Sequence, residues 1–294
     1  MAEMESTIRA APLAPGWSER LRGVAVAARP RSFLEAYGMV AVVIIVVMVV
    51  AAPLIAPFDP LEQNVGPPVQ APSASHLLGT DQLGRDEFSR MLFGGRNSLL
   101  IAVMVIALAG SFGVLVGAVS GFAGGIVDEV LMRIVDIFLA FPSIMLALVV
   151  SAALGPSLEN AAISIAVAWW PVYARLIRGQ VLVVKEQEFV RASRTLGASP
   201  LRLLARVVLP NSLGVMKTVF ILDVGYAIIA GSTLGFLGLG VSPPTPEWGS
   251  MIRESIQLPN AWWLTLSPGI AIMLFVSGLN FAGAAITRST RETP

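Results

Sequence analysis

The sequence of 294 residues contains no cysteine, a single histidine and only two lysines. Without cysteine, the chain cannot form disulfide bonds, thiolate nucleophiles or cysteine-ligated metal sites. The lone histidine, His76, cannot form a histidine cluster, and its proline- and serine-rich surroundings predict a solvated or hydrogen-bonded loop residue. Neither lysine follows a glycine, so the Gly-Lys pair of a nucleotide-binding P-loop is absent. We therefore predict no catalytic site, no cofactor and no metal in this chain.

Charge is also scarce, because 13% of the residues are charged whereas a soluble domain carries about a quarter. Hydrophobic residues make up 55% of the chain, and the mean hydropathy is +0.75. A helix needs about 20 apolar residues to cross the hydrocarbon core of a bilayer. The sequence thus predicts an all-α integral membrane protein with six transmembrane helices, at residues 38–58, 98–122, 134–153, 161–177, 212–239 and 264–286.

The basic residues suggest how these six segments are oriented. With the N-terminus in the cytoplasm, 16 Lys and Arg residues lie inside and 4 lie outside, as the positive-inside rule requires. Both termini are then cytoplasmic. The predicted regions are a cytoplasmic tail (1–36), a first transmembrane helix (37–58), an extracytoplasmic loop (59–97), a transmembrane core (98–288) with a cytoplasmic basic loop at 185–210, and a C-terminal tail (289–294).

The basic loop (residues 185–210) contains the amphipathic stretch EFVRASRTLGASPLRLLARVVLPN, which is residues 188–211. We predict a short helix at 187–196, ended by Gly197, which tolerates the left-handed conformation of a helix C-terminus. A second helix is expected from Pro200, with Ser199 as its N-cap, until Pro210 breaks it. Its predicted apolar face holds Leu201, Leu204 and Val208.

Two interpretations of the basic loop stay open on this pattern alone. It can be an interfacial helix pair that places Arg202 and Arg206 among lipid headgroups. It can also be a coupling helix that inserts into a groove of a cytoplasmic motor protein.

Charged residues at membrane depth are expensive and usually face protein or water. Asp223, in the fifth predicted span, is a candidate for a substrate pathway or for a contact with a second membrane subunit, and a structural role is equally open. Arg133 and Asp136 are three residues apart, so we expect them to pair with each other or with headgroups. In the second span, Gly110, Gly113 and Gly117 are spaced for close helix packing.

The basic loop resembles the EAA loop of binding-protein-dependent ABC importer permeases. That motif is Glu-Ala-Ala, a glycine four residues after the second alanine, and a later Leu-Pro. The matching positions here are Arg191, Ala192, Ser193, Gly197, Leu209 and Pro210. Arg191 replaces the acidic residue and Ser193 replaces the second alanine. The resemblance implies that the loop contacts an ATPase through Glu188, Arg191, Ala192, Ser193, Arg194, Leu196, Gly197, Arg202, Leu209 and Pro210.

Three further stretches, at residues 76–102, 121–148 and 235–252, resemble the C-type permease of the dipeptide and oligopeptide subfamily. The resemblance implies a type I ABC importer permease fold in the bacterial cytoplasmic membrane. It also implies a homologous B-type permease, two cytoplasmic ATPase subunits that hold ATP and Mg, and an extracytoplasmic binding protein, with no nucleic acid partner. The implied cargo is a di- or oligopeptide, with glutathione or chelated metal as alternatives.

Two other functions fit the sequence less well. A secondary transporter usually carries several intramembrane acids and internal repeats, and this chain has few such acids and no convincing duplication. A membrane-anchored scaffold has no need of a glycine-rich fifth span and a large basic loop. Neither alternative explains the motif resemblance.

Overall fold

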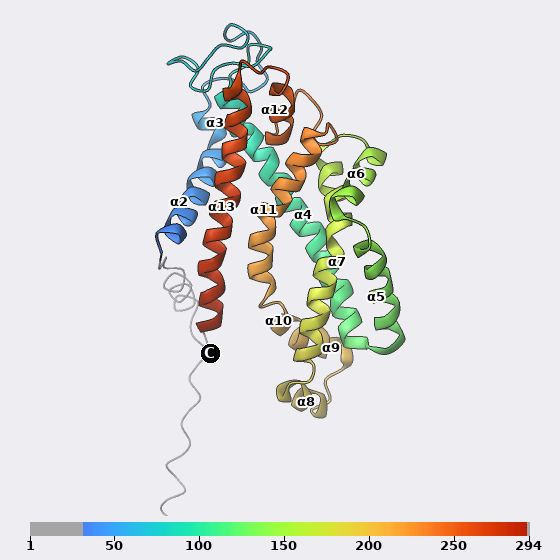
Figure 1. The fold of residues 1–294 in the computed structure, drawn as a ribbon. Coiled ribbons are helices and arrows are strands. Elements are labelled where there is room, and N and C mark those ends of the chain that lie inside the picture. Colours follow the sequence, from blue (N-terminus) through green and yellow to red (C-terminus); the bar gives the residue numbers. More distant parts are fainter. Residues whose placement is uncertain (1–31, 293–294) are drawn as a thin grey trace, which may run out of the picture.

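The computed structural model describes residues 32–292, and Figure 1 shows them as an elongated bundle of helices. One end of the bundle carries long loops, and the opposite end carries the short helices of the basic loop. Within residues 32–292, β structure is limited to an isolated bridge between Thr80 and Asp86. The helices are α2 (Phe33–Val50), α3 (Ala52–Ile55), α4 (Glu87–Ala123), α5 (Gly125–Leu139), α6 (Ser143–Leu154), α7 (Leu158–Val184), α8 (Glu188–Thr195), α9 (Pro200–Leu203), a π-helix (Leu204–Val208), α10 (Leu209–Ser212), α11 (Met216–Phe236), α12 (Trp248–Ser255) and α13 (Trp262–Glu292).

Length and composition support the prediction of a multi-span membrane protein. Within the described residues, α2, α4, α11 and α13 are long and apolar enough to cross a bilayer, and α5 with α6 forms a fifth candidate. The predicted six spans require α7 as the remaining one. It has 27 residues, so it is about 40 Å long. It carries the charged residues Glu159, Arg175 and Arg178.

The third predicted span is not one continuous helix, which corrects the sequence prediction. α5 and α6 are separated by a break of three residues and bend by 85°. Pro142 stands at the N-cap of α6 with extended backbone. A proline has no N–H for the helical ladder and restrains the residue before it, so the helix ends ahead of it.

Other boundaries also differ from those predicted. α4 begins at Glu87, so the end of the predicted extracytoplasmic loop is the first part of the helix that contains the second span. At the ends, α2 begins at Phe33 and α13 continues to Glu292. Most of the predicted N-terminal tail, and the last two residues of the C-terminal tail, lie outside the described residues.

The glycines of α4 allow α4 and α7 to pack closely, as their spacing predicted. A Cβ on Gly113 would lie 2.5 Å from the carbonyl oxygen of Trp170, and one on Gly117 would collide with the carbonyl of Ala174. Gly110 instead faces α11, where a Cβ would lie 3.0 Å from the ring of Phe220. α7 and α11 are therefore held against successive parts of the same helix.

The loop-rich end, which we call the loop cap (residues 56–86 and 237–261), contains buried polar side chains. His76 is buried, not solvated: its Nδ1 lies 2.9 Å from Oδ1 of Asp86, and its ring stacks on Phe58. Asp86 also caps α4 by accepting a hydrogen bond from the backbone N–H of Ser89. The hydrogen-bonded alternative of the His76 prediction is thus confirmed, because the ring pins the loop to the start of α4.

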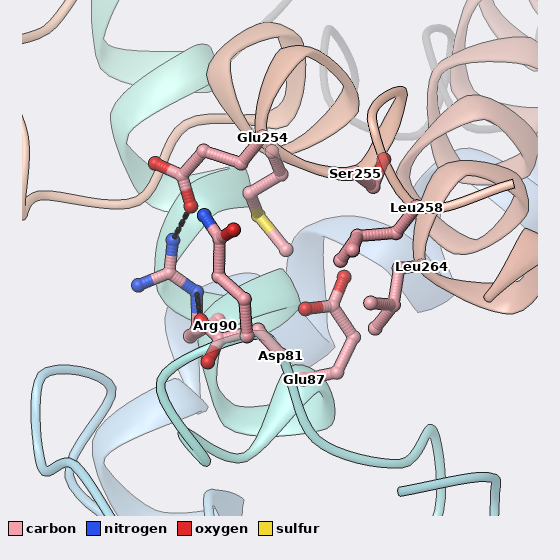
Figure 2. A pocket seen from close by; sticks show the side chains of 9 residues that line it. Asp81, Glu87, Arg90, Glu254, Ser255, Leu258 and Leu264 are labelled. Carbon is pink, nitrogen blue, oxygen red and sulfur yellow. Dashed lines mark hydrogen bonds and ion pairs between the residues drawn. The ribbon is translucent and has the colours of Figure 1, made fainter. Parts of the chain in front are cut away.

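Figure 2 shows part of a second polar group, where the loop cap meets the start of α4. The guanidinium groups of Arg85 and Arg90 both contact Oε2 of Glu254, at 3.1 and 2.9 Å, and both contact Asp81. Arg85 and Arg90 are fully buried, so their charges depend on these two carboxylates. The cavity lined by Arg90, Asp81, Glu254 and Glu87 has a volume of about 10 Å³, close to the smallest that holds one water molecule. It is a structural junction of the loop, α4 and α12.

Candidate functional site

The basic loop lies at the end of the bundle opposite the loop cap (Figure 1). Its first helix, α8, ends at Gly197, whose φ is +83°. The N–H of Gly197 donates to the carbonyl of Arg194, and the N–H of Ala198 donates to the carbonyl of Ser193. This pair of bonds is the Schellman motif, which satisfies the free carbonyls of the last helical turn. The predicted left-handed C-terminus at Gly197 is confirmed.

The second half of the basic loop differs from the prediction. α9, the π-helix and α10 follow one another without interruption, and the chain stays helical through Pro210 as far as Ser212. The π-helix widens the ladder over Leu204–Val208, just before the proline. Such a widened turn is a common way to accommodate an irregularity in a helix. Ser199 occupies the N-cap position, but its side chain accepts no capping hydrogen bond.

One face of the basic loop is anchored in the bundle. Val190 of α8, Leu203 of α9 and Val208 of the π-helix are buried in the apolar cluster that includes Ile177 and Val181 of α7. Leu201, predicted to share the buried face, is 77% exposed. The apolar face is therefore rotated relative to the prediction, and the loop is held firmly by α7.

The opposite face of the basic loop exposes apolar and basic side chains together. Leu196 is 88% exposed beside Gly197, and Leu201 lies on the same short hairpin. Arg194 and Arg202 are exposed, and neither forms an ion pair within residues 32–292. Arg191 differs, because it pairs with Glu186 at 3.0 Å on the surface.

The remaining predicted contact residues serve the helices themselves. Ser193 donates to the carbonyl of Phe189, and Glu188 is exposed in the first turn of α8. Ala192 is exposed, Leu209 is half-buried and Pro210 is exposed. All ten predicted contact residues are therefore in one loop, but they do not share one face.

A charged network at the base of the basic loop was not predicted. Arg178 of α7 forms two hydrogen bonds of 2.6 Å with the carboxylate of Asp128 in α5. Ser120 of α4 also donates to this carboxylate, and Nζ of Lys185 donates to the carbonyl of Gly121 at 2.8 Å. The network joins α4, α5 and α7 where the basic loop begins. Most of the contacting residues in this network are 50 or more positions apart in the sequence. No local sequence pattern could therefore predict the network.

The polar residues at membrane depth have partners that the sequence did not indicate. Asp136 pairs with Arg175 of α7, which corrects the expected pairing with Arg133 or headgroups. Asp223 is half-buried near the middle of α11 and accepts a hydrogen bond of 3.1 Å from the indole of Trp169. Tyr226 stacks on that indole, with the ring centroids 3.7 Å apart.

By its fold, the chain is a helical membrane protein whose basic loop is buried on one side and exposed on the other. Comparison with known proteins identifies its family. Residues 113–292 match the family described as "Binding-protein-dependent transport system inner membrane component". The chain belongs to this family, so it is a multi-pass inner membrane protein and a non-catalytic transport component.

Individual relatives cover most of the chain. It is 42% identical to the probable D,D-dipeptide transport system permease protein DdpC of Escherichia coli, over 84% of this chain and 83% of that protein. It is 43% identical to the dipeptide transport system permease protein DppC of Escherichia coli, over 84% of each chain.

The fold is also similar to that of a solved transporter. A chain of the inward-facing MetNI methionine ABC transporter matches with a TM-score of 0.56 and 19% identity, over 68% of this chain and 96% of the other. This likeness supports the predicted type I ABC importer permease fold.

Proposed function

We propose that the chain is one of two homologous permeases that together form the membrane pathway of an ATP-driven importer for dipeptides or short oligopeptides. A B-type permease is the sister subunit, two ATPase subunits bind ATP and Mg in the cytoplasm, and an extracytoplasmic protein delivers the cargo. The supporting observations are family membership and identities of about 40% to peptide permeases.

The single observation that carries the coupling role is the exposed face of the basic loop. Leu196 projects from the end of a helix whose other face is buried, and no atom lies within 4 Å of a Cβ placed on Gly197. A partner can therefore approach the backbone closely at this point. Arg194 and Arg202 lack ionic partners within the described residues, so they are available for acidic groups of the ATPase.

Motion is transmitted through the anchored face in this proposal. When the ATPase subunits close on ATP, they displace α8, and Val190, Leu203 and Val208 transfer the displacement to α7. Arg178 and Asp128 extend this contact to α5. Because packed interfaces move as units, the broken pair of α5 and α6 would move with α7.

The test is co-purification of the ATPase with the tagged permease. We expect Leu196→Asp to reduce recovery of the ATPase at least tenfold, because it places a carboxylate on the docking face. The matched control is Leu83→Asp, an exposed leucine of the loop cap. It should leave recovery of the ATPase unchanged.

Two outcomes separate the docking function from the headgroup alternative. If the basic loop only lies among lipid headgroups, Leu196→Asp will leave recovery of the ATPase intact. Unchanged recovery of the ATPase at normal membrane insertion would contradict the proposal.

A further inference from the structure

A carboxylate and two aromatic rings meet at mid-length of α7 and α11. The indole N–H of Trp169 donates to Oδ2 of Asp223 at 3.1 Å. The indole lies face to face with the ring of Tyr226, with an interplanar angle of 20°. The hydroxyl of Tyr226 is 3.1 Å from Oγ of Ser143, the first residue of α6. We call Trp169, Asp223, Tyr226 and Ser143 the midspan cluster.

The midspan cluster is partly exposed in this chain. All four of its residues are half-buried, and Asp223 forms no ion pair within residues 32–292. The side chain of Tyr173, next to the cluster, is fully buried, and its hydroxyl lies close to Asp223 and Trp169. The carboxylate of Asp223 therefore has polar neighbours but no counter-charge.

The exposed part of the cluster does not suit a lipid environment. A carboxylate at membrane depth usually faces protein, water or a transported ion. The helix is also interrupted directly before Ser143, between α5 and α6, and non-helical backbone at membrane depth occurs where it meets protein or a water-filled cavity. Both observations fit a cluster that faces protein or water and not lipid.

We propose that the midspan cluster is a transient binding site for the ammonium group of a peptide during its passage. The inference rests on the proposed import function and names the part of the cargo that is recognised. Asp223 supplies the counter-charge, and the faces of Trp169 and Tyr226 supply cation–π attraction, which is effective within about 6 Å of a ring.

The chemistry suits a cargo of variable sequence. Every peptide with a free N-terminus carries an α-amino group whose pKa is about 7.7–8.0, so it is largely protonated at neutral pH. A site for this group accepts peptides regardless of their side chains. One carboxylate and two ring faces also bind weakly, which allows release toward the cytoplasm.

The absence of cysteine permits a direct test with one introduced thiol. Ser143→Cys, in the complete transporter reconstituted in proteoliposomes, is treated with a trimethylammonium or a sulfonate methanethiosulfonate reagent of similar size. We expect the cationic reagent to react about tenfold faster relative to free cysteine, which corresponds to about 1.4 kcal/mol. Dialanine should slow this reaction, and N-acetyl-dialanine, which has no ammonium group, should not.

Substitutions test whether Asp223 causes the preference for the cationic reagent. Asp223→Asn should abolish the charge preference and Asp223→Glu should retain it. The matched control Asp136→Asn removes another carboxylate at membrane depth, which pairs with Arg175, and should leave the preference unchanged. If Ser143→Cys does not assemble, Ala140→Cys in the same break provides the thiol.

Three results would overturn the ammonium site. They are equal reaction rates for the two reagents, a thiol that reacts only after the sister permease is removed, and loss of the other subunits from Asp223→Asn on purification. The last two would assign the cluster to a subunit contact. Failure of the proposed import function is separate, because it would show as wild-type proteoliposomes that never accumulate dialanine with ATP and binding protein.

Discussion

Arg85 of the loop cap and Arg90 at the start of α4 are buried and share two carboxylates. By contrast, Arg194 and Arg202 in the basic loop are exposed and have no ionic partner within residues 32–292. The same residue type thus has two functions at opposite ends of one bundle. A buried arginine must be neutralised by its own chain, since desolvation is expensive. An exposed one can remain available to a partner. The comparison shows that the two buried arginines are neutralised within the chain, and it supports the proposal that a partner subunit contacts the basic loop.

The largest effect is expected from a substitution that disrupts the charged network of the loop cap. Glu254→Gln leaves the guanidinium groups of Arg85 and Arg90 with Asp81 as their remaining ionic partner. Because removal of one partner strands a buried charge, we expect the free energy of unfolding to fall by roughly 3–5 kcal/mol. Thermal unfolding of the detergent-solubilised chain measures this loss. A loss below about 1 kcal/mol would show that the network is not needed for stability.

A second prediction concerns the packing of α4 against α7, which joins the two ends of the bundle. Gly117→Val would place a branched side chain against the carbonyl of Ala174, where α4 meets α7. Overpacking of this kind typically costs about 1–3 kcal/mol. The matched control is Gly269→Val in α13, where no neighbouring part of the chain lies within 4 Å of an added Cβ. Equal stability of the two variants would contradict close packing at Gly117.

A smaller effect is expected in the basic loop. Gly197→Ala has space for its Cβ, but alanine at φ +83° costs roughly 1–2 kcal/mol. The change should act locally and raise hydrogen exchange of the last amides of α8, without changing global unfolding. Gly179→Ala, inside α7 and also without a neighbour within 4 Å, is the control. It should stabilise the helix by up to about 1 kcal/mol.

The smallest effect is expected at an exposed ion pair of the basic loop, and it tests the difference between the two ends of the bundle. Glu186→Gln removes the partner of Arg191 in an ion pair whose side chains are 65% and 68% exposed. Exposed pairs contribute about 0–1 kcal/mol, so unfolding should hardly change. Raising the salt concentration should remove what difference remains. A loss as large as that of Glu254→Gln would refute the distinction between the two ends.

Local features of the site could be predicted from the sequence. Gly197 ends α8 because a left-handed residue is needed there, and glycine adopts that conformation without strain. The spacing of Gly113 and Gly117 likewise predicted close approach of a helix. These predictions succeeded because they depend on one residue or on one face of one helix.

Features that depend on distant residues could not be predicted in this way. Asp136 pairs with Arg175, 39 residues away, and not with the neighbouring Arg133. Pro210 does not break its helix, since the preceding π-helix accommodates it. The pair Trp169 and Trp170 gave no sign that the two rings serve different sites. Trp169 contacts Asp223, whereas Trp170 packs against Phe112.

The sequence alone determined the class of the protein, since apolar segments of about 20 residues and few charges are compatible only with a membrane. It also located the basic loop and its central glycine. Only the tertiary structure decided which arginines are neutralised and which stay available, and where a carboxylate meets two aromatic rings. The reason is physical: burial and pairing depend on side chains that the fold brings together from distant parts of the chain.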